Sequence, residues 1–441
     1  MKPSQLIALA FAGIILLGTL LLCLPISSRG GTSCGLRTAL FTATSCTCVT
    51  GLVLADTWTQ WSGFGQTVII CLIQIGGLGF MSVASLVVFA LRKKVSLKQQ
   101  MLIAQSIGLE GIGDTVRLQK QILKGCFLIE GIGAVLLTAR FLFDYPFGTA
   151  LRLGVFHSIS AFCNAGFDIL GFREPGASLI TYGSDPAVCL ILSALIILGG
   201  LGFIVWDEVL RIRRPKKWSI YTKLVLLATA ALLLGGTVLF CLTEWRNPGT
   251  LGAFRPGEKL NAAFFQSVTT RTAGFAGVDQ GELTDAGKAV TVLLMLIGGS
   301  SGSTAGGLKT VTFVVLLLFL YSRIRGKRTV EIYHRTIGQE LVLNALTIFG
   351  LMITLTFFGA IFLSLTCPAG FLDCLYETVS ALATVGLTTG ITASLSVPAQ
   401  YLIILYMYFG RVGLLTLSLG FLQEDPAEQQ YRYAKANLLI G

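Results

Sequence analysis

The stretch Cys48-Val49-Thr50-Gly51-Leu52 recurs in this chain in three further versions, each with its glycine after a short apolar run. The other versions are Cys163-Asn164-Ala165-Gly166-Phe167, Arg271-Thr272-Ala273-Gly274-Phe275 and Ala383-Thr384-Val385-Gly386-Leu387. Their glycines are 115, 108 and 112 residues apart, which indicates a fourfold repeat. We therefore predict four tandem units, at residues 1–94, 95–217, 218–328 and 329–441.

The composition indicates a membrane protein. Of the 441 residues, 54% are hydrophobic and 12% are charged, whereas soluble domains carry roughly 25% charged residues. Eight apolar runs approach the roughly 20 residues of a spanning helix, near 6–24, 66–91, 122–143, 187–206, 221–242, 289–321, 340–365 and 401–422. The first run is long for a signal peptide and fills the first position of the first repeat, so we interpret it as a span. The predicted fold is an all-α, multi-pass integral membrane protein.

The positive charges lie between the repeats. The net charge is +11, and basic clusters occupy the linkers at 92–98, 211–217 and 323–328. Because basic loops stay in the cytoplasm, this pattern predicts that the linkers and both termini face the cytoplasmic side of the cell membrane. The same clusters can contact anionic lipid headgroups or an acidic surface of a cytosolic partner. Basic residues that border membrane spans argue against nucleic-acid binding.

The eleven cysteines lie mostly within apolar runs, where small packing residues are expected. Cys367 and Cys374 both fall on the predicted outer side, where they can form a disulfide. No CxxC pair and no His/Cys cluster predicts a transition-metal site.

Each repeat has a short apolar segment between its two spans. These segments, at 36–48, 151–163, 260–271 and 373–383, are too short to cross a bilayer and are predicted to be re-entrant half-helices. Non-helical backbone inside a membrane is tolerated only where it is buried in protein or lines a water-filled cavity. Four copies therefore predict a pseudo-fourfold arrangement around one central pore. Half-helix C-termini that point at this pore would place partial negative charge there and favour cations.

The glycine segments that follow the half-helices are the predicted cation-binding filter, and we call them the filter segments. Glycine reaches the positive φ that turns successive carbonyls inward at little steric cost. The other side chains are small and uncharged, which leaves cation binding to the backbone carbonyls. The predicted filter residues are Val49, Thr50, Gly51, Asn164, Ala165, Gly166, Thr272, Ala273, Gly274, Thr384, Val385 and Gly386.

The second spans share a glycine motif, at 75–80, 198–203, 297–302 and 409–414, where small residues allow close helix packing. The third copy expands into ten residues of Gly, Ser, Thr and Ala, which do not form a stable helix. We predict a flexible gate here, the 298–307 loop, made of Gly298, Gly299, Ser300, Ser301, Gly302, Ser303, Thr304, Ala305, Gly306 and Gly307. A nucleotide-binding P-loop is not expected, because the GxxxxGK[ST] spacing fails by one residue and no strand precedes it.

Arg411 occupies the position in the fourth copy where the other three have a glycine. A charge within a span is costly and usually faces a cavity or a partner. Two interpretations remain open from the sequence. Arg411 forms a structural ion pair with Glu130 in the third span, or it is a positive barrier in the permeation path below the filter and belongs to the gate.

The four span–half-helix–glycine–span units resemble the Trk/Ktr/HKT superfamily of potassium transporters along essentially the whole chain. Thr384-Val385-Gly386 also matches the start of the potassium-filter sequence TVGYG. The direct start with the first repeat and the ending at 437–441 are more similar to the bacterial Ktr membrane subunit than to the longer Trk type.

This resemblance implies potassium uptake by a homodimer with one pore per protomer. It also implies a cytosolic nucleotide-binding regulatory ring of the KtrA type, with K+ as the transported ion and Na+ as an activating or coupling ion. No nucleotide site is expected on this chain. In the superfamily a serine at the first filter glycine goes with sodium permeability, so Gly51 implies a preference for K+. No copy has the tyrosine of TVGYG, and we therefore expect less sharp selectivity than in a tetrameric channel.

Two other classes of protein fit the pattern less well. A secondary carrier with inverted repeats and broken helices would bind its substrate with ionisable side chains and would place basic linkers on both sides. An integral-membrane enzyme needs a nucleophile, base or metal constellation, and no HExxH occurs. The sequence therefore predicts a potassium-translocating subunit and not an enzyme.

Overall fold

Four long helices, one near the start of each sequence repeat, dominate the computed structural model. The structure describes residues 3–79, 115–212, 214–327 and 329–413. The long helices are α1 (Pro3–Cys23), α7 (Thr115–Phe141), α11 (Ile220–Glu244) and α15 (Gln339–Thr366). Among the described helices, these four are long and apolar enough to cross a membrane singly. They confirm the predicted spans at 6–24, 122–143, 221–242 and 340–365.

Four shorter helices are the predicted half-helices, and each packs against the long helix of its own repeat. They are α2 (Leu36–Thr47), α8 (Phe147–Phe162), α12 (Pro256–Thr269) and α16 (Phe371–Leu382). Their lengths of 12 to 16 residues are below what a bilayer requires. The C-terminal half of each is mostly buried, because it runs into the interior of the molecule.

The second helix of each repeat ends before its predicted span does, which corrects three of our span predictions. These helices are α4 (Gly63–Leu78), α9 (Pro186–Leu201), α13 (Asp285–Leu296) and α17 (Val397–Val412). We expected a break only in the third copy, yet α4, α9 and α17 end at Gly79, Gly202 and Gly413 with φ of 79°, 91° and 97°. Glycine takes this left-handed conformation without a Cβ penalty and so ends a helix readily.

The structure describes the chain beyond these helix ends in the second and third repeats. The predicted span at 187–206 bends by 95° between α9 and α10 (Phe203–Arg211). In the third repeat the 298–307 loop separates α13 from α14 (Thr310–Ile324). Several predicted features lie outside the described residues. They are the remainders of the predicted spans at 66–91 and 401–422, the basic cluster at 92–98 and the 437–441 ending.

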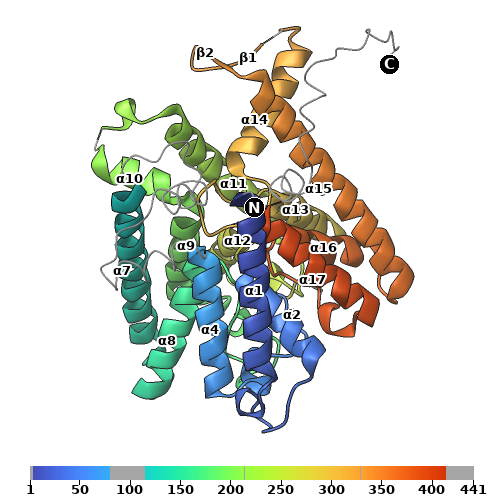
Figure 1. Cartoon of the computed structure of the whole chain (residues 1–441). Coiled ribbons are helices and arrows are strands. Elements are labelled where there is room, and N and C mark those ends of the chain that lie inside the picture. The colour runs from blue at the N-terminus through green and yellow to red at the C-terminus, as the bar shows by residue number, and fades with distance from the viewer. Residues whose placement is uncertain (1–2, 80–114, 213, 328, 414–441) are drawn as a thin grey trace.

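Smaller elements complete the described chain. They are α3 (Thr57–Gln60), the antiparallel hairpin of β1 (Val330–Ile332) and β2 (Arg335–Ile337), and 3-10 turns at Pro25–Ser27, Ile180–Tyr182, Pro215–Lys217, Leu251–Ala253 and Thr392–Ser394. The hairpin and the end of α14 project from the helices at the top of Figure 1.

The helices of neighbouring repeats pack in a cyclic order. Each second helix contacts the half-helix of the next repeat: α4 packs on α8, α9 on α12, α13 on α16, and α17 on α2 of the first repeat. Figure 1 shows the first and last repeats, blue and red, side by side. The two ends of the described chain are therefore neighbours in space.

Cys367 and Cys374 do not form the disulfide that we considered. Both thiols are free. The Cys374 thiol lies on buried α16, 3.9 Å from the carbonyl oxygen of Ala369, whereas the Cys367 thiol contacts Ser396 at the start of α17. The turn between α15 and α16 thus points the two side chains at different partners.

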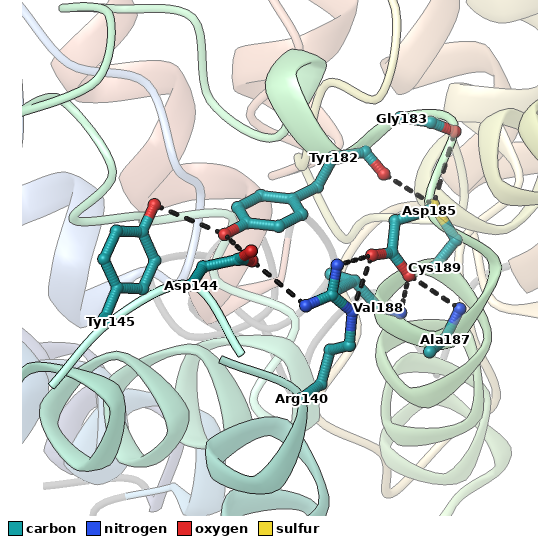
Figure 2. A network of polar contacts seen from close by, with 9 residues as sticks. All are labelled: Arg140, Asp144, Tyr145, Tyr182, Gly183, Asp185, Ala187, Val188 and Cys189. Atoms are coloured by element: carbon teal, nitrogen blue, oxygen red, sulfur yellow. Dashed lines mark hydrogen bonds and ion pairs between the residues drawn. The ribbon is translucent and has the colours of Figure 1, made fainter. Parts of the chain in front are cut away.

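A polar network fastens the second repeat together (Figure 2). Arg140, near the end of α7, donates from Nε to Asp185 Oδ2 at 2.8 Å and from Nη1 to Asp144 Oδ2 at 3.0 Å. The Tyr182 hydroxyl also donates to Asp144, at 2.9 Å. Asp185 accepts the first two free N–H groups of α9 at 2.9 and 3.1 Å. One carboxylate therefore both caps α9 and ties it to α7.

Replacing Asp185 with alanine should destabilise the protein by about 2 kcal/mol, because α9 loses its cap and Arg140 loses an acceptor. The measurement is the thermal unfolding midpoint in detergent. Glu331→Ala is the matched control, since the Glu331 carboxylate makes exposed contacts, an ion pair with Lys327 and a hydrogen bond from the Thr329 hydroxyl, both at 3.1 Å. An exposed ion pair contributes at most about 1 kcal/mol. Equal shifts for the two variants would contradict a structural role for this network.

Candidate functional site

The backbone of all four filter segments takes the same unusual conformation. The residue two positions before each glycine is left-handed, with φ of 56° at Val49, 59° at Asn164, 66° at Thr272 and 51° at Thr384. The glycines have φ of 100°, 69°, 80° and 98° in the same order. The residue between them has no positive φ. Each segment therefore alternates in backbone hand in the same way.

The left-handed residue before the glycine was not predicted from the sequence. Three of the four are β-branched, and such residues rarely adopt a positive φ. Conformations of this kind persist only where the surrounding structure enforces them, and they gather at functional sites. Their repetition at one position in four segments makes the filter segments the candidate site.

The four filter glycines face one another in a closed order. A Cβ built on Gly51 would lie 2.6 Å from the carbonyl oxygen of Ala165, and one on Gly166 would lie 2.8 Å from that of Ala273. A Cβ on Gly274 would collide with the Val385 carbonyl oxygen, and one on Gly386 with that of Thr50. Each glycine thus meets the residue before the next glycine, and the fourth returns to the first. The structure brings all four predicted filter segments together.

Hydroxyl groups on the half-helices hold the filter segments, and sequence reasoning missed them. The Ser45 and Ser380 hydroxyls accept the N–H groups of Gly51 and Gly386, at 3.1 and 3.0 Å. The Ser160 and Thr269 hydroxyls donate to the carbonyls of the phenylalanines that follow the other two glycines, at 2.7 and 2.8 Å. A Ser or Thr five or six residues before every glycine was the available signal.

The 298–307 loop lies against the broken helix and the half-helix of the second repeat. The N–H groups of Ser300 and Thr304 donate to the carbonyls of Gly200 and Gly199, at 3.0 and 3.2 Å. The Thr304 hydroxyl donates to the carbonyl of Phe162, the last residue of α8, at 3.1 Å. Backbone groups that lose their helical partners at two interrupted helices therefore form hydrogen bonds with each other.

Three cationic side chains donate to carbonyls of the same loop. Arg411 Nη1 donates to Thr304 at 2.5 Å, Lys309 Nζ to Ala305 at 2.8 Å, and Arg271 Nη2 to Gly298 at 2.9 Å. None of the three belongs to an ion pair among the described residues. Of these three, the sequence analysis had assigned a role only to Arg411, although Arg271 stands out in its filter segment where the other copies have Cys or Ala.

Arg411 joins three repeats and is not paired with Glu130. Its Nη2 donates to the carbonyls of Gly76 and, at 3.2 Å, Gly77 in α4, while Nη1 holds the loop. The Glu130 carboxylate instead accepts both its close contacts from Gln74 Nε2, at 2.9 and 3.1 Å. The ion-pair interpretation was therefore wrong, because carbonyls released by the broken helices provide nearer acceptors.

Comparison with known proteins decides the family. The family described as "TrkH: Cation transport protein" matches residues 17–433. The chain is 41% identical to the potassium/sodium uptake protein NtpJ of Enterococcus hirae, over 100% of this chain and 98% of the relative. It is also 41% identical to the Ktr system potassium uptake protein B of Bacillus subtilis, over 100% and 97%.

The chain belongs to the TrkH family. The potassium transporter TrkH from Vibrio parahaemolyticus has a similar solved structure, with a TM-score of 0.74 over 96% of this chain and 85% of that one. Their sequence identity of 18% makes this a statement about the fold alone. Family membership and the apolar helices together establish a multi-pass membrane protein.

Placing a methyl group on Gly386 should destabilise this TrkH-family protein far more than placing one on Gly390. Both glycines have positive φ, 98° and 95°, so alanine strains either backbone by about 1–2 kcal/mol. A Cβ on Gly390 meets open space, whereas one on Gly386 collides with the Thr50 carbonyl. Thermal unfolding midpoints of Gly386→Ala and Gly390→Ala compare the two. Similar unfolding midpoints for the two variants would show that the filter segments can move apart without loss of stability.

Proposed function

We propose that this chain is the membrane subunit of a potassium uptake system, with its pore at the point where the four filter segments meet. The closed order of glycine–carbonyl contacts carries this proposal, since it supports a pseudo-fourfold arrangement of the units 1–94, 95–217, 218–328 and 329–441. The relatives named above are potassium or potassium/sodium uptake proteins. Such a protein moves an ion without changing it chemically and is not an enzyme.

The chemistry of the meeting point favours a monovalent cation. Four half-helices end there, and the C-terminal end of a helix carries partial negative charge. Aligned carbonyls can replace the hydration shell of an ion. None of the twelve filter residues is ionisable, so the site attracts cations through dipoles rather than through a fixed charge that would hold them tightly.

The 298–307 loop and Arg411 form the gate in this proposal. The loop lies next to the filter, because a Cβ on Gly306 would collide with the Thr384 hydroxyl. Arg271, Lys309 and Arg411 fix the loop and bring three positive charges to the same region. While the loop is in place, these charges repel a cation that leaves the filter.

We assign the basic linkers to the cytoplasmic side. The side chains of Arg211, Arg214, Arg323 and Arg325 are exposed, and the α10 and β1–β2 ends of these linkers both lie in the upper part of Figure 1. We propose that this face, with both termini, points into the cytoplasm and contacts a nucleotide-binding regulatory ring of the KtrA type or anionic lipid. A homodimer and activation by Na+ complete the proposal.

Gly51→Ser tests the pore assignment. Because a Cβ at Gly51 displaces the Ala165 carbonyl, the serine variant should lower the preference for rubidium over sodium by roughly tenfold, about 1.4 kcal/mol. The measurement is rubidium and sodium uptake into proteoliposomes that contain the full chain, with excess potassium as competitor. Gly390→Ser is the control and should keep the wild-type preference. An unchanged preference in folded Gly51→Ser would contradict selection at these glycines.

Removing residues 300–305 tests the gate. The loop ends already adjoin, with the N–H of Gly298 bonded to the Leu308 carbonyl at 2.9 Å, so the shortened chain can close. Rubidium uptake should rise roughly tenfold, equivalent to a barrier about 1.4 kcal/mol lower. Arg411→Ala should also raise uptake, whereas Arg325→Ala at the exposed end of α14 should not. Lower uptake by a correctly folded deletion protein would refute the gate.

A further inference from the structure

Two arginines from different repeats converge on one tryptophan, and we call Arg29, Trp58 and Arg152 the arginine–tryptophan cluster. The guanidinium carbons of Arg29, beyond the end of α1, and of Arg152, on α8, lie 4.5 and 5.3 Å from the centre of the Trp58 ring. Both arginines are exposed. The end of α1 and the start of α8 lie at the lower edge of Figure 1, opposite the β1–β2 hairpin. The cluster is therefore on the side of the molecule away from the basic linkers.

Neither guanidinium has a counter-ion in the part of the chain that the structure describes. The ion pairs found there belong to other residues, and Arg152 Nη2 donates to the uncharged Gln66 Oε1 at 2.5 Å. The carboxylate of Asp56 lies nearby in the sequence, but it accepts backbone N–H groups, including those of Trp58 and Gly176. Because both cations lie beside one ring, they are within about one Debye length, roughly 10 Å at 0.1 M salt, and repel each other. An anion bound to both would neutralise them.

Apolar side chains beside the cluster place it at the edge of the membrane. Phe64 and Leu151 are 42% and 43% exposed. They are next in the sequence to Gly63 and Arg152, and a Cβ on Gly63 would lie 3.7 Å from Arg152 Nη2. Exposed apolar side chains of a multi-pass membrane protein face lipid, and tryptophan is enriched at the level of the headgroups. The two guanidiniums therefore lie at the level of phospholipid phosphate groups.

We propose that Arg29 and Arg152 bind the phosphate group of an anionic phospholipid, while the Trp58 ring holds both guanidiniums in position. The lipid belongs to the leaflet away from the basic linkers, which the proposed orientation makes the outer one. A guanidinium binds phosphate oxygens with two parallel N–H donors. A zwitterionic lipid is disfavoured, because its ammonium group offsets the charge of its phosphate. Since the two arginines belong to the first and second repeats, the bound lipid joins these repeats at the membrane surface.

Thermal unfolding of the full chain in detergent, with added phosphatidylglycerol or phosphatidylcholine, tests the site. Phosphatidylglycerol should raise the unfolding midpoint of the wild-type protein at lower concentration than phosphatidylcholine does. Arg29→Gln and Arg152→Gln should each raise the phosphatidylglycerol concentration for half-maximal stabilisation about tenfold, since each removes a charge-assisted hydrogen bond. Arg29→Lys keeps the charge without the paired donors, so its half-maximal concentration should fall between those of wild type and Arg29→Gln.

Arg37→Gln is the matched control. Arg37 is an exposed arginine at the start of α2, on the same side of the molecule, and it has no ion pair among the described residues. Its variant should require the same phosphatidylglycerol concentration as wild type. Equal concentrations for wild type and for both cluster variants, Arg29→Gln and Arg152→Gln, would overturn the site, because the stabilisation would then come from general contact with lipid.

A titration with inorganic phosphate distinguishes a lipid headgroup from a free anion. Inorganic phosphate should not stabilise the wild-type protein at the phosphatidylglycerol concentrations that do. Stabilisation by inorganic phosphate at those concentrations, lost in Arg29→Gln and Arg152→Gln, would overturn the lipid as the ligand. Neither readout involves ion uptake, so a negative result here leaves the proposed function standing, and a failure of the proposed function leaves this site standing.

Discussion

Every peptide group that leaves a helix inside a membrane needs a new partner, because hydrocarbon offers none. This constraint governs the structure, since each described repeat contains one half-helix and one second helix that ends early. The groups released by one repeat bond to those of another: Ser300 and Thr304 donate to the carbonyls of Gly200 and Gly199. The breaks are therefore tolerated only because the four repeats are packed against one another in order.

Helix C-termini leave carbonyls without helical partners, and at these breaks cationic side chains donate to several of them. A guanidinium has five N–H donors and no acceptor, so a single arginine can satisfy carbonyls from several segments. Arg411 does this for Thr304, Gly76 and Gly77. On the proposed gating, the same interaction has two consequences. It stabilises the loop in place and sets positive charge beside the ion path, so moving the loop removes both the obstruction and its electrostatic support.

The sequence predicted what local patterns determine and missed what depends on distant partners. The half-helices were found to within about four residues, because a short apolar run before a repeated glycine has few other interpretations. The breaks at Gly79, Gly202 and Gly413 were missed, since a single glycine in an apolar run is compatible with a continuous helix. The Arg411–Glu130 pair was wrong because opposite charge was the only criterion. The bond from Arg271 to Gly298 was missed because its partners lie 27 positions apart in the sequence.

The four repeats have diverged in a way that a ring of four identical subunits cannot. Glycine is kept in all four filter segments because a Cβ at any of them would meet a carbonyl of the next segment. Elsewhere each copy differs: the third repeat supplies the loop, the fourth supplies Arg411, and the first supplies the carbonyls of Gly76 and Gly77 that hold this arginine. Close packing thus preserves the glycine in every copy. Because the copies are joined in one chain, each position around the filter can acquire a different function.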